Sequence, residues 1–227
     1  MNTWLFRIVN DGFKNPFFDW FLPLFSDKDY LIIPAILVMG YWAYVGGKRA
    51  RFICVCLLIS IAITDIGSEK VIKNIVRSPR PYAVLEGVHL HRGDAWRDYD
   101  PAYYPFDPRK SYSFPSSHAA NVAAATVVLA FLSLHSLWVM VPLTLLVGIS
   151  RVYTGNHFPL DILGAYLWGG IVGGGVTAVA LEFRRRFWAL NDENCHSGTP
   201  VERKWFYLLL GVWIVGNFLF LHLNLFD

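Results

Sequence analysis

Six long apolar runs divide this chain, and they restrict its architecture because a membrane-spanning helix needs about 20 mostly apolar residues. The runs cover 30–47, 52–77, 117–135, 137–154, 159–181 and 205–223. The chain is 55% hydrophobic and only 16% charged, whereas globular chains contain about 25% charged residues. The sequence therefore predicts an all-α integral membrane protein with about six transmembrane helices, formed as a single domain over residues 1–227.

The first 29 residues have a different character from these runs. Within them, residues 4–26 mix Phe and Leu with the charged residues Arg7, Asp11, Lys14 and Asp19. Pro16 also interrupts any single helix here. Such a segment is typical of amphipathic helices in the membrane interface, so we expect an N-terminal interfacial segment over residues 1–29. The net charge of +3 is too small to favour a nucleic-acid partner.

Counting the spans assigns the polar connections to the two sides of the membrane. Runs 30–47 and 52–77 form a hairpin, so the connection 78–114 lies opposite the turn 48–51. The next pair of runs returns the chain to the same side as 78–114 near residue 155. Basic residues gather at helix ends on the other side, as Lys48, Arg49, Arg51, Arg184, Arg185 and Arg186. The positive-inside rule makes that side, with the loop 182–204, cytoplasmic.

Lys73 and Arg80 lie at the end of the second apolar run, seven residues apart. Seven residues are two helical turns, so we expect both side chains on one face, with Pro79 and Pro81 ending the helix. Arginine offers phosphate a bidentate fork, and lysine acts as a point charge. The alternative is a basic residue that snorkels to the interface from a helix end.

Two further charged residues flank Lys73 on the same run. Glu69 lies four residues before it, and we expect this carboxylate to steady the ammonium group, because buried acids in membranes are usually paired. Arg77 lies four residues after Lys73. It is a candidate for a second phosphate group, and a contact with lipid headgroups or solvent is the equal alternative.

The segment Pro115-Ser116-Ser117-His118 opens the run 117–135. Serine is a favoured N-cap, and the free N–H groups of a helix N-terminus attract anions. Ser116 and Ser117 can add hydroxyl donors to such a site. His118, in the first turn, can donate a proton to a leaving oxygen. A plain capped helix would carry the same residues.

The third segment contains Ser150, Arg151, His157 and Asp161. His157 and Asp161 are four residues apart, and we expect them to share the face of a helix that Pro159 starts. Asp161 would then accept a hydrogen bond from one ring nitrogen of His157 and leave the other as a nucleophile. A structural ion pair is the alternative, but the nearby cations of Arg151, Arg80 and Lys73 favour a catalytic role for the pair.

Together these segments resemble the signature of the type 2 phosphatidic acid phosphatase superfamily, which also includes glucose-6-phosphatase and vanadium-dependent haloperoxidases. Its motifs are Lys-x6-Arg-Pro, Pro-Ser-Gly-His and Ser-Arg-x5-His-x3-Asp, and the resemblance covers about residues 70–165. Ser117 stands where the family usually has glycine; its backbone amide would be kept, and its side chain would narrow the pocket.

The resemblance implies a role for each matching residue. His157 would form a phosphohistidine, Asp161 would orient it, and His118 would protonate the leaving group. The phosphate-binding residues would be Lys73, Arg80, Ser116, Ser117 and Arg151. Because the basic clusters place the opposite side in the cytoplasm, we expect the active site to face the extracytoplasmic side of a bacterial inner or plasma membrane.

These observations predict an enzyme that removes phosphate from a membrane lipid phosphate or diphosphate, with neither metal nor cofactor. Undecaprenyl diphosphate, phosphatidylglycerophosphate, phosphatidic acid and lipid A all stay open as substrates. The alternatives are a phosphotransferase acting between lipids and a non-catalytic lipid-binding or transport protein. Binding alone needs only the cations, so the set of His118, His157 and Asp161 argues for catalysis. The apolar runs exclude a soluble haloperoxidase.

Overall fold

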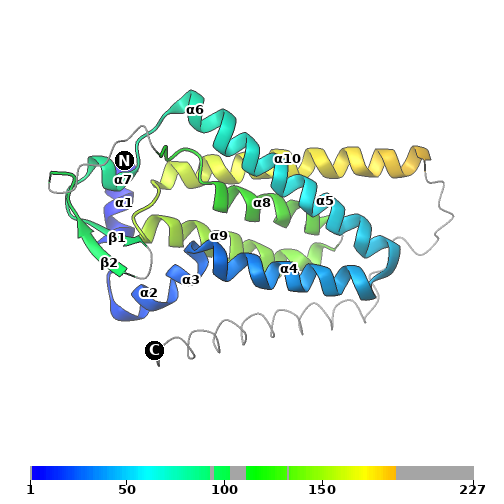
Figure 1. Ribbon diagram of the computed structural model, residues 1–227, viewed down its shortest axis with the longest axis horizontal. Helices are drawn as coiled ribbons and strands as arrows, with labels where there is room; N and C mark the ends of the chain where they lie inside the picture. Colours follow the sequence, from blue (N-terminus) through cyan, green and yellow to red (C-terminus); the bar gives the residue numbers. More distant parts are fainter. Residues whose placement is uncertain (1, 93–94, 103–110, 132, 188–227) are drawn as a thin grey trace.

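The computed structural model describes residues 2–92, 95–102, 111–131 and 133–187, which form a mostly helical bundle (Figure 1). Its long helices are α4 (Lys28–Val45), α5 (Gly47–Ile66), α8 (Ser117–Ala130), α9 (Leu137–Tyr153) and α10 (Pro159–Phe187). A 3-10 turn, η3 (Leu134–Ser136), leads into α9. Helix α8 lies at the centre and packs against α5, α9 and α10. The first five predicted runs are therefore helical, and the sixth, 205–223, lies outside the described residues.

Three stretches within the described part of the chain are long and apolar enough to cross a membrane. They are Gly47–Val84, Leu134–Tyr153 and Pro159–Arg185. The apolar helices Leu31–Val45 and Ser117–Ala130 are shorter. The 14 residues of α8 extend about 21 Å, against a hydrocarbon core of about 30 Å. The total of six spanning helices stays a prediction.

The second predicted run is not one continuous α-helix. After α5 the chain forms a π-helical segment, η1 (Gly67–Ile72), and then the single turn α6 (Lys73–Val76). Arg77 follows in the left-handed conformation, with φ of 51°, which ends the helix. The expectation that Arg80 shares a helical face with Lys73 is therefore wrong. Arg80 lies in extended backbone between Pro79 and Pro81, because both prolines disfavour helix before them.

Short elements gather at one end of the bundle (Figure 1). They are α1 (Asn2–Asn10), α2 (Pro16–Phe21), α3 (Pro23–Ser26), α7 (Pro81–Val84), β1 (Val88–Arg92) and β2 (Ala95–Tyr99). The strands form an antiparallel hairpin in which Val88 pairs with Tyr99 and His89 pairs with Asp98. The sequence had predicted only a polar connection here. Its apolar and aromatic positions, such as Val88 and Trp96, suit a half-buried strand pair.

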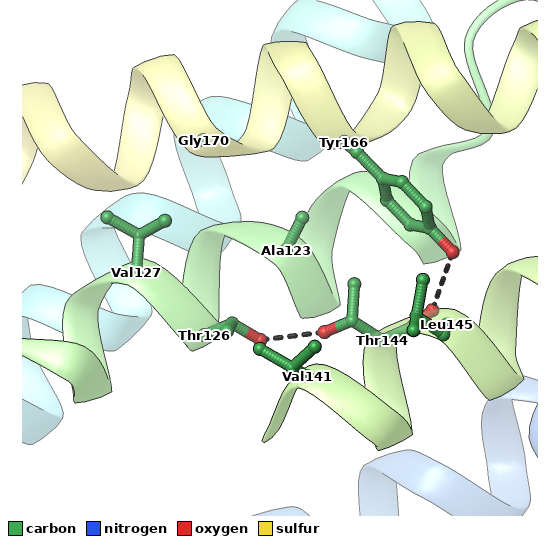
Figure 2. A pocket seen from close by; sticks show the side chains of 8 residues that line it. All are labelled: Ala123, Thr126, Val127, Val141, Thr144, Leu145, Tyr166 and Gly170. Atoms are coloured by element: carbon green, nitrogen blue, oxygen red, sulfur yellow. Dashed lines mark hydrogen bonds between the residues drawn. The ribbon is translucent and has the colours of Figure 1, made fainter. Parts of the chain in front are cut away.

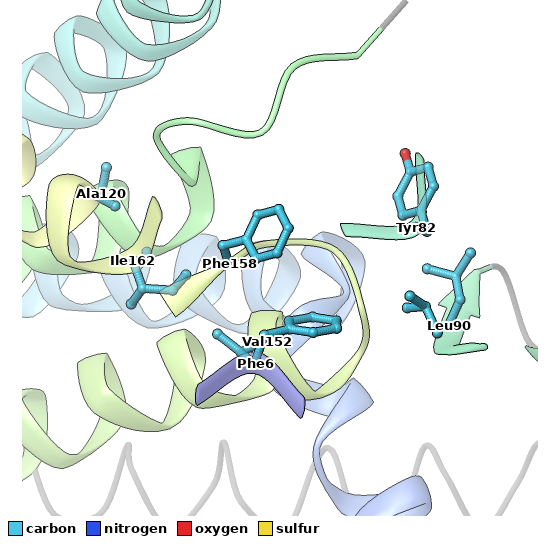
Figure 3. Packing of buried hydrophobic residues seen from close by; sticks show 10 residues of the cluster. Phe6, Tyr82, Leu90, Ala120, Val152, Phe158 and Ile162 are labelled. Atoms are coloured by element: carbon cyan, nitrogen blue, oxygen red, sulfur yellow. The ribbon is translucent and has the colours of Figure 1, made fainter. Parts of the chain in front are cut away.

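A hydrophobic cluster joins this end cap to the bundle (Figure 3). Phe6 on α1 is fully buried, and its ring lies 5.5 Å, centre to centre, from that of Phe158. Tyr82 and Leu90 complete the contact from the cap, and Val152 from α9. The N-terminal segment is thus partly built into the protein core. Its other face exposes Trp4, Phe13, Phe17 and Trp20, and the location of this face in the membrane interface stays a prediction.

Helices α8 and α10 approach each other closely at two glycines. A Cβ atom on Gly169 would lie 2.1 Å from the carbonyl oxygen of Ala120, and one on Gly173 would lie 2.6 Å from that of Ala124. Small residues permit such backbone contacts between membrane helices. The close packing fixes the two helices that carry His118 and Asp161 relative to each other.

The far end of the bundle carries the basic clusters. Helix α10 continues to Phe187, so the predicted connection 182–204 begins later than expected, and its remainder lies outside the described residues. Lys48 at the start of α5 and Arg185 near the end of α10 lie opposite the end cap (Figure 1). This arrangement agrees with the span count, which put the motif segments and these clusters at opposite ends.

Candidate active site

The structure brings the three motif segments together under the end cap, although 88 positions separate Lys73 from Asp161 in sequence. Lys73 begins α6, Arg80 precedes α7, and Ser116 precedes α8. Arg151 lies in the last turn of α9, His157 in the following turn, and Asp161 in the first turn of α10. Lys73, Arg80 and Arg151 are close enough to interact electrostatically with one another and with His118.

Arg151 is held from the N-terminal segment. Its Nη1 donates hydrogen bonds to the carbonyl oxygen of Ser26, at 2.8 Å, and to Ser26 Oγ, at 2.7 Å. The neighbouring Ser150 Oγ donates to the carbonyl oxygen of Leu22, at 2.6 Å. Helix α3 therefore fixes the orientation of this guanidinium group. No pattern in the sequence pointed to Ser26, because the contact joins residues 125 positions apart.

Several buried donors at the site have no hydrogen-bond partner in the described ranges of the chain. Arg80 Nη1 reaches the carbonyl oxygen of Asn156 at 3.4 Å. Arg80 Nε, Arg151 Nε and Ser116 Oγ are buried and have no hydrogen-bond partner among the described residues. Buried polar groups are normally satisfied, so unpaired donors beside three cations form a site that suits an anion such as phosphate.

Ser117 makes a contact that its family position did not predict. Its Oγ donates to Glu69 Oε1 at 2.6 Å, and the same oxygen accepts a hydrogen bond from Lys73 Nζ. The expected pairing of Glu69 with Lys73 is therefore present. The hydroxyl of Ser117 joins the second motif to the first through Glu69, and so it is not free to bind phosphate in this structure.

His157 and Asp161 are both buried, but they do not form the direct hydrogen bond that the sequence predicted. His157 Nδ1 and Asp161 Oδ2 lie 3.7 Å apart. His157 also lies before the helix rather than on it, because Pro159 occupies the first helical position and disfavours helix before it. Asp161 Oδ2 accepts the backbone N–H of Phe158 at 2.7 Å, which caps the start of α10.

The turn that carries His157 is fixed by its backbone. The N–H groups of Asn156 and His157 both donate to the carbonyl oxygen of Arg151, at 3.2 Å. Gly155 has φ of +75°, and a Cβ atom there would lie 2.8 Å from Val88 Cγ1. Glycine thus allows the turn to form directly beneath β1.

Burial lowers the pKa of His157 well below its ordinary range, and the positive charges of Arg80, Arg151 and Lys73 lower it further. A lower pKa means that the imidazole stays neutral at physiological pH. Neutral imidazole has a free lone pair, which is the form that a nucleophile requires.

Arg77 does not join this cluster through hydrogen bonding. It is exposed, and its Nε donates to the carbonyl oxygen of Asn74 at 2.9 Å. Its left-handed backbone conformation turns it away from the helical face that the sequence predicted. Among the described residues, no group of three or more His, Cys, Asp or Glu side chains is placed to hold a metal ion.

A separate recess of about 160 Å³ lies between α8, α9 and α10 (Figure 2). Thr126 Oγ1 and Thr144 Oγ1 are 2.7 Å apart there, and Tyr166 Oη donates to the carbonyl oxygen of Thr144 at 2.8 Å. The remaining lining is apolar. None of the motif residues lines this recess, so it is distinct from the cation cluster.

A family model described as the PAP2 superfamily matches residues 49–186, more than half of the chain. This chain belongs to the PAP2 superfamily. All three motif segments fall inside the matched range, so family membership and the geometry of the cluster concern the same residues. The family resemblance that the sequence predicted is confirmed.

Individual relatives carry several phosphatase names. The chain is 29% identical to an undecaprenyl-diphosphatase of Sulfolobus acidocaldarius over 63% of its own length, and the match spans 60% of that relative. It is 31% identical to a lipid A 4'-phosphatase of Porphyromonas gingivalis, covering 81% of this chain and 74% of the relative.

A solved structure shares the fold. The crystal structure of a transmembrane PAP2 type phosphatidylglycerolphosphate phosphatase from Bacillus subtilis superposes with a TM-score of 0.57 and 19% identity, covering 81% of this chain and 88% of that one. The shared fold and the apolar helices indicate an integral membrane protein. At this identity the likeness concerns the fold alone.

Proposed function

We propose that this protein is a lipid phosphatase that removes phosphate from a membrane lipid phosphate or diphosphate through a phosphohistidine at His157. One observation carries the proposal. The buried Arg80 Nε, Arg151 Nε and Ser116 Oγ, which have no hydrogen-bond partner within the described part of the chain, lie in the same cluster as a histidine whose low pKa keeps it neutral. The arrangement can hold a phosphate group and present a nucleophile to it.

In the first step, the lone pair of His157 Nε2 forms a bond to phosphorus. The bond between phosphorus and the lipid oxygen breaks, and His118 donates a proton to that oxygen. Lys73, Arg80 and Arg151 stabilise the negative charge on the transferring phosphoryl oxygens. In the second step, His118 takes a proton from water, the water oxygen bonds to phosphorus, and the N–P bond breaks to release inorganic phosphate.

This scheme assigns charge stabilisation to fixed cations rather than to a metal ion. Three basic side chains and the N-terminus of α8 already supply positive potential at the cluster. Glu69 holds Lys73 in place, and Ser117 holds Glu69. We therefore propose that the reaction is independent of added metal and that vanadate, a phosphate mimic, inhibits it.

The position of the cluster supports a lipid substrate. The motif residues are at the ends of apolar helices, so the head of a lipid can reach them while its tail stays in the bilayer. Each buried methylene of that tail contributes about 0.8 kcal/mol. One named relative is an undecaprenyl-diphosphatase and another is a lipid A 4'-phosphatase, and we propose a polyprenyl diphosphate as the first substrate to test. Arg77, turned toward Asn74, adds no support for a second phosphate.

We also propose six spanning helices in a bacterial inner or plasma membrane, with the end cap on the extracytoplasmic side. The basic clusters at the far end of the bundle support this orientation (Figure 1). The exposed aromatic side chains of the N-terminal segment, including Trp4 and Trp20, would then lie at the outer interface.

The test is phosphate release by the purified protein in detergent, over undecaprenyl diphosphate, phosphatidylglycerophosphate, phosphatidic acid, lipid A and a water-soluble monoester. We expect a lipid to be preferred in kcat/KM, with EDTA leaving the rate unchanged. His157→Ala should lose activity, whereas His135→Ala, an exposed histidine outside the cluster, should keep it. No release from any lipid would favour a binding protein, and release to an added lipid alcohol but not to water would favour a phosphotransferase.

A further inference from the structure

A serine outside the three motifs lies between His157 and Asp161. Ser113 is fully buried and comes two residues before Pro115. Its Oγ donates a hydrogen bond to Asp161 Oδ2 and lies 3.3 Å from His157 Nδ1. The direct distance from His157 Nδ1 to Asp161 Oδ2 is 3.7 Å, too long for a hydrogen bond. The hydroxyl therefore bridges the two residues.

The bridge determines which ring nitrogen of His157 carries the proton. A serine hydroxyl has one hydrogen and two lone pairs. That hydrogen is donated to the carboxylate of Asp161, so the oxygen can only accept from His157 Nδ1. Nδ1 must then be protonated, and the lone pair of Nε2 is free.

We propose that Ser113 is a positioning residue that relays the effect of Asp161 to His157, in the order Nδ1–H to Ser113 Oγ–H to carboxylate. The inference rests on the proposed function, in which His157 is the nucleophile. Without the bridge, the carboxylate is too far away to hold the ring in the Nδ1–H tautomer. Ser113 itself touches neither the phosphate nor the leaving oxygen.

The relay also acts during phosphoryl transfer. When Nε2 donates its lone pair to phosphorus, the ring becomes an imidazolium and its Nδ1–H bond becomes more acidic. Ser113 Oγ accepts that hydrogen bond while its own hydrogen stays directed at Asp161, so the negative charge of the carboxylate stabilises the new positive charge through one hydroxyl. The Nδ1 proton stays on the ring, and no other bond changes.

The backbone around Ser113 should keep its position when the side chain is replaced. The backbone N–H of Ser113 donates to the carbonyl oxygen of Ser78 at 2.8 Å, and that bond is unaffected by replacement of the side chain. Ser113→Ala therefore removes the bridge and keeps the backbone contact beside Arg80. Ser113→Cys, which keeps the size and weakens the hydrogen bond, serves if the alanine variant does not fold.

The experiment is rapid-quench phosphorylation by labelled lipid in wild type, Ser113→Ala, Asp161→Asn and the double variant. We expect each single change to slow phosphoenzyme formation at least tenfold with KM altered less than threefold, and the double variant to be no slower than the slower single variant. Ser136→Ala, which removes another buried hydroxyl that donates to a backbone carbonyl, should leave the rate unchanged. The relay would be overturned if the two single-variant reductions in rate multiply in the double variant. A Ser113→Ala rate within twofold of wild type would overturn it as well.

A second readout separates the relay from the proposed function. Nitrogen-15 NMR of labelled histidine, assigned with His157→Gln, reports the tautomer of His157 without any turnover. We expect the Nδ1–H form in wild type and a mixture of tautomers in Ser113→Ala. An Nε2–H form in wild type would overturn the relay even if the enzyme is active. If wild type shows the Nδ1–H form of His157 but forms no phosphoenzyme, the proposed function is wrong and the relay stands.

Discussion

Ser26→Ala tests whether the N-terminal segment takes part in phosphate binding. Ser26 Oγ and its carbonyl oxygen both accept hydrogen bonds from Arg151 Nη1, at 2.7 and 2.8 Å. The substitution removes the first acceptor and leaves the second. Because Arg151 is half-buried and its buried Nε has no hydrogen-bond partner among the described residues, a guanidinium group that has lost one anchor will be oriented less firmly toward the phosphate.

The size of the effect follows from the bond that is lost. A hydrogen bond to a charged group contributes about 1.5–3 kcal/mol. Since the carbonyl acceptor remains, we expect a loss near the lower limit, about 1.5 kcal/mol, which corresponds to roughly tenfold in kcat/KM. Arg151 would hold phosphate in both the ground state and the transition state, so the loss should raise KM and the inhibition constant of vanadate more than it lowers kcat.

The assay is the initial rate of phosphate release against lipid concentration in mixed micelles, repeated with vanadate. Ser136→Ala is the matched control, because it removes a buried serine hydroxyl outside the cation cluster. If Ser26→Ala stays within twofold of wild type while Arg151→Ala is inactive, the segment does not orient Arg151. A fall in kcat alone would equally contradict a role in phosphate binding.

Three further predictions concern the bond from Ser117 to Glu69, the protonation of His157 and the membrane topology. Ser117→Gly introduces the usual family residue and removes the hydrogen bond from Ser117 to Glu69. Glu69 still pairs with Lys73 but is held less firmly, so we expect KM to rise about threefold to fivefold. An unchanged KM would show that the bond from Ser117 to Glu69 has no functional role. The lowered pKa of His157 means that the unfolded chain binds the extra proton below about pH 6.5, so the melting temperature should fall as pH drops from 7 to 5 and fall less in His157→Gln. If the melting temperature falls equally with pH in wild type and in His157→Gln, His157 is not a buried neutral histidine. In whole cells without other accessible thiols, Arg97→Cys should react with an impermeant maleimide and Arg185→Cys should not; the reverse pattern would invert the topology.

The sequence predicted those parts of the protein that depend on local pattern. Apolar runs predicted the positions of α4, α5, α8, α9 and α10, because length and composition determine membrane helices. The motif spacing and the span count predicted that Lys73, Arg80 and Arg151 would meet at one end. Glu69 was correctly paired with Lys73, because four residues along a helix is a short-range relation.

The parts that the sequence missed depend on contacts between distant segments. Ser113 reaches His157 and Asp161 across 44 and 48 positions, and Ser26 reaches Arg151 across 125. No periodicity encodes such pairs. The direct bond between His157 and Asp161 was predicted from a four-residue spacing, but Pro159 starts the helix only after His157. The β hairpin was missed because its strands are short and contain several charged residues.

Trapping the phosphoenzyme tests the role of His157 most directly. Purified protein is mixed with phosphorus-32-labelled lipid phosphate in the presence of EDTA, quenched in alkali within milliseconds, digested and analysed by mass spectrometry. We expect an acid-labile, alkali-stable phosphate on His157 that forms together with the dephosphorylated lipid, precedes the release of inorganic phosphate and is absent in His157→Ala. Label on another residue, or full phosphate release by His157→Ala, would contradict it.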